Sequence, residues 1–235
     1  MQGSSGPQHL SRYHARHFYD ACLFLSCPSA SCPPQLVSQI AAGEIVERPA
    51  SVLKELLENS IGAGATRIGI DMEQGGVKRL HVKDNGCGIR KDELALALSR
   101  YATSKIGTPD DLACLASLGF GGEALPSIAS VSRLTLTSGE PDMPSGWRIE
   151  FNGGEQFKQV PLVAHSAGTS VDMVDLFFNV PARRKFLHTE LSHAEILLCR
   201  IALSRFDVAL ELTRSGRMVH RLRGDAFLSA GGAAY

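Results

Sequence analysis

The chain has 235 residues, and its 24 lysines and arginines balance 24 aspartates and glutamates, so the formal net charge is zero. Hydrophobic residues make up 44% and charged residues 20% of the sequence, which is ordinary globular usage and excludes a wholly disordered chain. No window reaches the roughly 18 consecutive apolar residues of a membrane span, and the balanced charge excludes a globally basic nucleic-acid binder.

The N-terminal stretch, residues 1–32, is rich in Ser, Gly and Pro and predicts a disordered leader. Its one apolar run, residues 21–25, is shorter than the roughly 7–15 residues of a secretory signal. The chain has six cysteines, at positions Cys22, Cys27, Cys32, Cys87, Cys114 and Cys199. None forms a C-x-x-C pair or another common zinc spacing, so we expect reduced thiols in a cytosolic protein.

Regular patterning begins with a short predicted helix at residues 36–45. A second helix is predicted from Pro49 to Ile61, because apolar residues follow an i, i+3, i+4 rhythm and glycines then end it. Alternating apolar residues at 68–72 and 80–82, joined through two glycines, predict an antiparallel hairpin. A turn at 84–88 leads into a helix over residues 91–100.

The stretch 101–122 has little periodicity, and a loop of this length in a compact domain is usually functional. A short helix is predicted at 123–130. Strands are then predicted at 134–136, 147–151, 157–160 and 170–174, helical segments at 181–187 and 191–204, and a final hairpin at 208–212 and 218–222. These elements predict an α+β, two-layer sandwich in which helices cover one face of a mostly antiparallel sheet.

Three motifs contain residues that are candidates for catalysis or ligand binding. Glu55 and Asn59 are four residues apart and therefore share one helix face, where a carboxylate could take a proton from water and an amide oxygen could bind Mg²⁺. A solvated helix face has the same residues. Asp84 to Gly88, with the sequence Asp-Asn-Gly-Cys-Gly, could receive a flat ligand with an exocyclic amine, or could form an Asx-type turn.

The third motif is a pair of loop segments that could cradle phosphates with backbone amides at a helix N-terminus. The two segments are Ala102, Thr103, Ser104 and Lys105, and Gly119, Phe120, Gly121, Gly122, Glu123, Ala124 and Leu125. They do not form the G-x-x-x-x-G-K-[ST] loop, which excludes a P-loop.

In this order, the motifs resemble those of the MutL DNA mismatch-repair proteins. The stretch QIAAGEIVERP at 39–49 and the stretch NVPARRKFL at 179–187 match two further signatures of that family. The resemblance covers residues 33–224. The 40–49 and 181–187 segments distinguish the chain from gyrase B, heat-shock chaperones and histidine kinases, which share only the nucleotide-site motifs.

The resemblance implies an ATPase domain with the Bergerat-type ATP-binding fold and with ATP and Mg²⁺ as ligands. It implies Glu55 as the general base, Asn59 as the Mg²⁺ ligand, Asp84 as the acceptor for the adenine amine, and Thr169 in support. Gly88, Ala102 to Lys105 and Gly119 to Leu125 would line the phosphates and form a lid. Closure of such a lid is a switch biased by the γ-phosphate.

The implied partners are ATP, DNA, and mismatch-recognition and downstream repair proteins. The resemblance also implies that two copies form a nucleotide-dependent homodimer, and it implies no association with a membrane. The implied location is the bacterial cytoplasm, with association to the nucleoid during repair. We expect an unmatched tail at 225–235, and the second, transducer-like domain and the C-terminal dimerisation domain of the family to be absent, as in a truncated or frameshifted product.

Two positions depart from the family pattern. Gly62 stands where the family has an acidic residue, and Gly121 where it usually has arginine, which removes charge and adds backbone freedom near the site. The alternative function is therefore a nucleotide-binding module or truncated fragment without significant turnover.

The balanced charge hides a local surplus. Residues 176–224 contain nine Lys and Arg against four Asp and Glu, a net of +5. Arg183, Arg184 and Lys185 lie in this segment and are candidates for weak, non-specific DNA contact, although a solvated helix face would have the same composition.

Overall fold

The computed structural model describes residue 42 and residues 45–99, 122–141, 143–156, 160–185, 187 and 191–224, all of them in the compact unit that follows Pro33. The strands are β1 (Arg67–Glu73), β2 (Arg79–Asp84), β3 (Arg133–Gly139), β4 (Ser145–Asn152), β5 (Glu155–Gln156), β6 (Leu162–Ala164), β7 (Gly168–Val174), β8 (Ala209–Arg214) and β9 (Arg217–Leu222). Within this part of the chain they form one sheet in the order β5-β4-β3-β7-β2-β1-β8-β9, and β6 pairs with β4.

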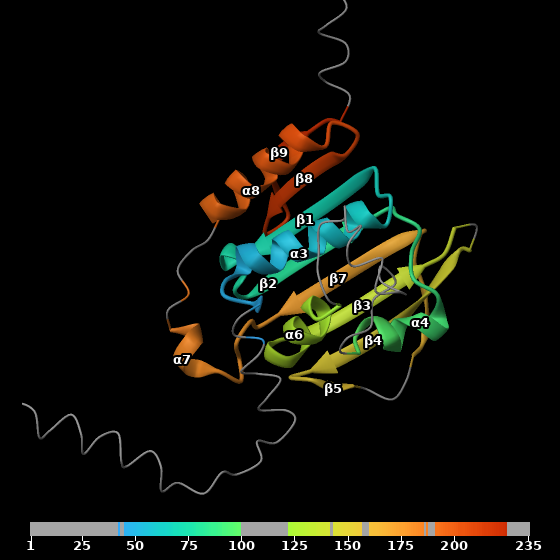
Figure 1. The fold of residues 1–235 in the computed structure, drawn as a ribbon, viewed down its shortest axis with the longest axis horizontal. Helices are drawn as coiled ribbons and strands as arrows, with labels where there is room; N and C mark the ends of the chain where they lie inside the picture. Colours follow the sequence, from blue (N-terminus) through green and yellow to red (C-terminus); the bar gives the residue numbers. More distant parts are fainter. Residues whose placement is uncertain are drawn as a thin grey trace, which may run out of the picture. The chain divides into compact units, whose positions relative to one another are not determined.

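The helices are α3 (Pro49–Gly62), α4 (Lys91–Ala97), α6 (Ala124–Val131), α7 (Pro181–Arg184) and α8 (Leu191–Ser204). Helix α3 packs against β2 and contacts both α6 and α8, so these three helices cover the same face of the sheet (Figure 1). The predicted two-layer α+β architecture is confirmed. Helix α4 lies against β4.

The core lies between the sheet and these helices, because side chains alternate between the two faces of each strand. In β1, Ile68, Ile70 and Met72 are fully buried, as are Leu53 and Leu57 of α3. Burying one such side chain stabilises the fold by roughly 1.5–3 kcal/mol. A register shift of one residue would turn the apolar face outward, so this core fixes the register.

The opposite face of the sheet is polar. Asp71 of β1, His81 of β2 and Asp172 of β7 are cross-strand neighbours in one row. The Arg79 guanidinium donates to both carboxylate oxygens of Asp172, over 2.8 and 2.9 Å. This geometry is bidentate and therefore orients both side chains.

Both predicted hairpins are confirmed. β1 and β2 pair antiparallel with Ile70 opposite Val82, and the β8–β9 turn places Ser215 and Gly216 at positive φ, 50° and 77°. The mostly antiparallel sheet contains one parallel pair, β1 with β8. This pairing joins segments about 140 residues apart in the chain, as the bond from the Thr213 hydroxyl to Ile70 O illustrates with its separation of 143 residues.

Some element boundaries differ from those predicted. Helix α4 ends at Ala97 rather than near residue 100. Helix α7 has only four residues, with Lys185 as its C-cap residue, and Leu187 lies outside any helix. The strand predicted at 157–160 and the helix at 36–45 fall largely outside the described residues, and Val160 is not in a strand. Among the described helices, none is long and apolar enough to cross a membrane.

Candidate functional site

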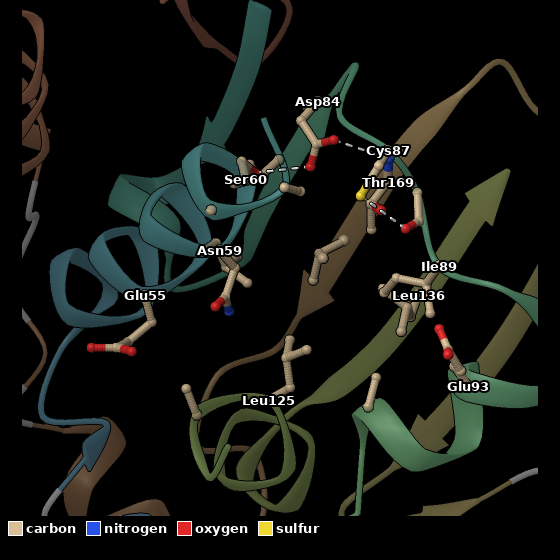
Figure 2. A pocket seen from close by; sticks show the side chains of 18 of the residues that line it. Glu55, Asn59, Ser60, Asp84, Cys87, Ile89, Glu93, Leu125, Leu136 and Thr169 are labelled. Carbon is tan, nitrogen blue, oxygen red and sulfur yellow. Dashed lines mark hydrogen bonds between the residues drawn. The ribbon is translucent and has the colours of Figure 1, made fainter. Parts of the chain in front are cut away.

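Helix α3 carries the first pair of candidate residues. Pro49 occupies its first turn, where a missing N–H costs nothing. Leu53, Leu56 and Leu57 are buried in the core. The opposite side of the helix therefore presents Glu55 and Asn59, which both line one pocket. Figure 2 shows the two side chains projecting from the same side of the helix.

Lys54 lies between two carboxylates of the same helix. Its ammonium nitrogen is 2.9 Å from Oε1 of Glu58 and 3.4 Å from Oε1 of Glu55. The hydrogen bond to Glu58 and the nearby charge of Glu55 raise the pKa of Lys54. Glu58 is itself buried, with only 8% of its side chain exposed. The Lys54 charge thus holds one carboxylate in the interior and lies beside the one that faces the pocket.

Asp84, the last residue of β2, lies at the other end of the pocket and is buried. Its Oδ2 accepts a bond from the Ser60 hydroxyl at 2.9 Å. Its Oδ1 accepts from Gly86 N at 2.9 Å and from Thr169 N at 3.1 Å. Figure 2 shows this carboxylate between α3 and the strand that carries Thr169. A carboxylate has about four acceptor positions, so three protein donors leave one for a ligand.

The turn after Asp84 is the Asx-type turn that its sequence allows, because Gly86 N donates to Oδ1 of Asp84 at 2.9 Å. Oδ1 of Asn85 accepts bonds from Thr66 N at 2.9 Å and Arg67 N at 2.8 Å, which is a structural role. Gly88 has a φ of 73°, and a Cβ there would collide with the carbonyl oxygen of Gly139. Only glycine fits this position without strain. The turn is therefore fixed by Asn85 on one side and packed closely against β3 on the other.

The floor and the remaining walls of the pocket are mostly apolar. Val82, Leu136 and Val171 come from three neighbouring strands, and α4 contributes Leu96 and Ala97. Gly122, Ala124 and Leu125, at and before the N-terminus of α6, also line it. The cavity is about 560 Å³, within the usual range for a small-molecule site. An apolar floor with one buried acceptor at its end suits a flat heterocycle that carries an amine.

The structure brings most of the described candidates together. The candidates that line the pocket are Glu55, Asn59, Asp84, Gly88, Gly122, Ala124, Leu125 and Thr169. Glu123 precedes α6 as its N-cap residue and does not line the pocket. The candidates Ala102, Thr103, Ser104, Lys105, Gly119, Phe120 and Gly121 lie outside the described residues. Gly62, which departs from the family pattern, is exposed and lies in the pocket wall.

The three basic candidates lie on and directly after α7, and none of them lines the pocket. Arg184 is 3.3 Å from Asp175, and the Arg183 guanidinium lies 5.7 Å from the Phe177 ring centre. Lys185 is exposed. Two of the three side chains therefore contact their own domain.

Sequence reasoning missed two serines beside the site. Ser60 is buried and lies on the apolar side of α3, in line with Leu53, Leu56 and Leu57. A polar residue within an apolar stripe is the signal that could have identified it. Ser138 is fully buried near the end of β3, where a polar residue in the alternating pattern gives a weaker signal.

A protein-family model described as histidine kinase-, DNA gyrase B- and HSP90-like ATPase matches residues 47–174. MutL of Citrobacter koseri is 56% identical over 202 residues, which are 85% of this chain and 33% of that protein. MutL of Escherichia fergusonii is 56% identical over 199 residues, 83% of this chain and 32% of that protein. The chain thus spans about a third of the length of these relatives.

Similarity extends to solved structures. The ATPase domain of Aquifex aeolicus MutL, in a complex with ADP, is 32% identical and has a TM-score of 0.61 to this chain. The match covers 79% of this chain and 67% of the other. A structure described as the N-terminal domain of a DNA repair protein, 22% identical with a TM-score of 0.67, shares the fold.

Proposed function

The chain belongs to the histidine kinase-, DNA gyrase B- and HSP90-like ATPase family, and we propose that it binds ATP with Mg²⁺ in this pocket and hydrolyses it. One observation carries the proposal. Glu55 and Asn59 on α3 line the same cavity as the buried acceptor Asp84, so groups suited to the two ends of ATP face one space.

The base end of the site is built from Asp84 and Thr169. Three protein donors fix the Asp84 carboxylate, and its remaining acceptor position would take the amine of adenine. The apolar floor would cover the faces of the purine ring. The ADP complex of the Aquifex aeolicus relative supports this use of the pocket.

The phosphate end fits Mg²⁺ as well as ATP. Asn59 offers a neutral oxygen, and the described residues contain no cluster of three or more His, Cys, Asp or Glu that would form a cage of protein ligands. Mg²⁺ is usually held by one or two protein oxygens together with substrate phosphates. Asn59 would hold the ion, which supplies charge neutralisation at the phosphates.

Glu55 is the group we assign to proton transfer. Its carboxylate projects from the pocket wall one helical turn before Asn59, where it can orient a water and accept its proton as the water attacks the terminal phosphate. Phosphoryl transfer needs positioning and charge stabilisation more than covalent chemistry. Gly88, Gly122, Ala124 and Leu125, together with residues 102–105 and 119–121, would line the phosphates and form the lid.

We further propose that this activity serves DNA mismatch repair in the bacterial cytoplasm. Nucleotide would close the lid, drive the formation of a homodimer and lead to the recruitment of repair partners on DNA. The support is the 56% identity to MutL proteins over most of this chain. Light scattering with and without the non-hydrolysable analogue AMPPNP tests the dimer, because a mass that stays monomeric at saturating nucleotide would contradict it.

The alternative function is nucleotide binding without significant turnover. Gly62 in the pocket wall and Gly121 support it, because each replaces a charged residue of the family and adds backbone freedom. Both functions predict that the chain binds nucleotide, but only the first predicts that it releases phosphate from ATP.

Phosphate release from ATP and Mg²⁺ by the purified chain separates them. Glu55→Ala should lower the rate by at least roughly 100-fold, the usual contribution of a general base, while the affinity for ADP changes little. Glu150→Ala, which removes an exposed carboxylate of β4, should change neither. Equal release by wild type and Glu55→Ala, with ADP still bound, would establish the alternative.

A further inference from the structure

Ser138 of β3 lies directly behind the base end of the pocket. It is fully buried and does not line the cavity. Its hydroxyl oxygen is 2.8 Å from the backbone nitrogen of Ile89, 2.9 Å from the carbonyl oxygen of Gly168 and 2.8 Å from Oγ1 of Thr169. One hydroxyl thus joins the turn after Asp84 to the first two residues of β7.

The number of partners determines the direction of each bond. A serine hydroxyl has one hydrogen and two acceptor lone pairs. The N–H of Ile89 can only donate, so it occupies one lone pair. The carbonyl of Gly168 can only accept, so it takes the hydrogen. The remaining lone pair is satisfied when the Thr169 hydroxyl donates to Ser138, and a fully buried group favours the arrangement in which every position is used.

The consequence reaches the pocket through Thr169. Its single hydroxyl hydrogen points back to Ser138, so its oxygen presents only lone pairs to the cavity that it lines. The neighbouring Asp84 carboxylate also offers only an acceptor, since it has no hydrogen to donate. The backbone N–H of Thr169 is already directed to Asp84. Asp84 and Thr169 therefore both accept at this end of the pocket. Ser60 also lines the pocket, but its hydroxyl hydrogen is donated to Asp84.

We propose that Ser138 is a positioning residue that orients the Thr169 hydroxyl and so makes the base end of the pocket select an amine over a keto oxygen. The proposal rests on the proposed nucleotide site. An amino group at position 6 of a purine carries two N–H donors, whereas a keto oxygen carries none and would meet two acceptors. A site with buried hydrogen-bonding groups discriminates most strongly when a wrong ligand leaves them unpaired.

The test compares the dissociation constants of ADP and IDP, measured by calorimetry on the full chain with Mg²⁺. Wild type should prefer ADP. In Ser138→Ala, the Thr169 hydroxyl is released and can donate to the keto oxygen, so the preference should narrow by roughly fivefold, the worth of one hydrogen bond. ADP and IDP also differ at N1, where IDP carries an N–H, but this difference is the same for wild type and Ser138→Ala. A change in the ratio of the two constants between these proteins therefore reports on the orientation of the Thr169 hydroxyl.

A double-mutant cycle shows whether Ser138 acts through Thr169. In the Thr169→Val background, Ser138→Ala should leave the ratio of the two constants unchanged, because no hydroxyl remains to be oriented. Ser138→Thr keeps the hydroxyl and should retain the wild-type ratio. A merely structural role would weaken both nucleotides by the same factor and leave the ratio constant, which would overturn the proposal. If Ser138→Ala does not fold, Thr169→Val tests the group through which Ser138 acts. Removal of this oriented acceptor should also narrow the preference for ADP over IDP, and an unchanged ratio would overturn the proposal.

Failure of this proposal and failure of the proposed function give different results. If wild type binds neither ADP nor IDP, the nucleotide site itself is wrong. If wild type binds ADP and prefers it over IDP, but Ser138→Ala keeps that preference, only the role of Ser138 is wrong.

Discussion

The Ser60 hydroxyl donates a 2.9 Å hydrogen bond to Oδ2 of Asp84, and both groups are buried. This bond joins the helix that carries Glu55 and Asn59 to the strand end that forms the other end of the pocket. The spacing between the proposed hydrolytic end and the base end of the site is thereby fixed by a contact within the domain.

Ser60→Ala should weaken both the fold and the site. It removes the donor to Oδ2 of a buried carboxylate, and leaving such an atom unpaired costs about 1–3 kcal/mol. We expect the free energy of unfolding in urea to fall by that amount, and the affinity for ADP to fall as well. Ser204→Ala, an exposed serine at the end of α8, is the matched control. A Ser60→Ala variant as stable as this control would contradict the assigned bond.

Gly88→Ala should be far more damaging than Gly216→Ala. Both glycines have a positive φ, 73° and 77°, so alanine is strained by about 1–2 kcal/mol at either position. A Cβ at Gly216 meets nothing within 4 Å, whereas one at Gly88 collides with the backbone of Gly139. The collision adds about 1–3 kcal/mol. Thermal unfolding of the two variants separates the terms, and equal losses would show that the turn relaxes freely.

We propose that the basic segment contacts DNA, so Lys185→Ala should reduce DNA binding without affecting stability. Lys185 is exposed, whereas Arg184 is paired with Asp175 at 3.3 Å. Loss of one phosphate contact should make the slope of log affinity against log salt shallower by about one. Fluorescence anisotropy with a duplex at several salt concentrations measures the slope. Because Arg184 is already paired, Arg184→Ala should change this slope less than Lys185→Ala does. A larger change in Arg184→Ala would contradict the prediction.

Acidification should destabilise the domain through His81. Burial lowers the pKa of this histidine below its ordinary 6.5, against the opposing effect of the Asp172 charge. The Arg79 charge lowers the pKa further, and that of Asp71 raises it. The unfolded chain therefore binds more protons between the folded pKa and 6.5, and the free energy of unfolding falls as pH decreases through this window.

Urea unfolding of His81→Gln at pH 7.5 and pH 5.5 checks this expectation. The variant cannot take up the proton, so it should lose less stability than wild type between the two values. Burial also lowers the pKa of His165, so part of the wild-type loss should remain in the variant. An unchanged loss in His81→Gln would assign the whole effect to other groups.

Local pattern was sufficient for much of the fold. The spacing of the leucines and Pro49 predicted α3. Alternating apolar residues on either side of a turn predicted each hairpin. These predictions succeeded because each signal lies within one element or between elements that are neighbours in sequence. The candidates Glu55, Asn59 and Asp84 were likewise identified from their motifs, and the structure places all three around one pocket.

The tertiary structure decided what depends on distant contacts. The parallel pairing of β1 with β8 has no local signal, since neither strand specifies its partner. The same holds for the bonds at the base end of the pocket, where Thr169 N reaches Asp84 across 85 residues and the Ser138 hydroxyl reaches Gly168 O across 30. The sequence by itself therefore determined which side chains could carry the chemistry. Only packing of the strands determined the direction of the hydrogen bonds that orient them, because a hydroxyl takes its direction from the partners that surround it.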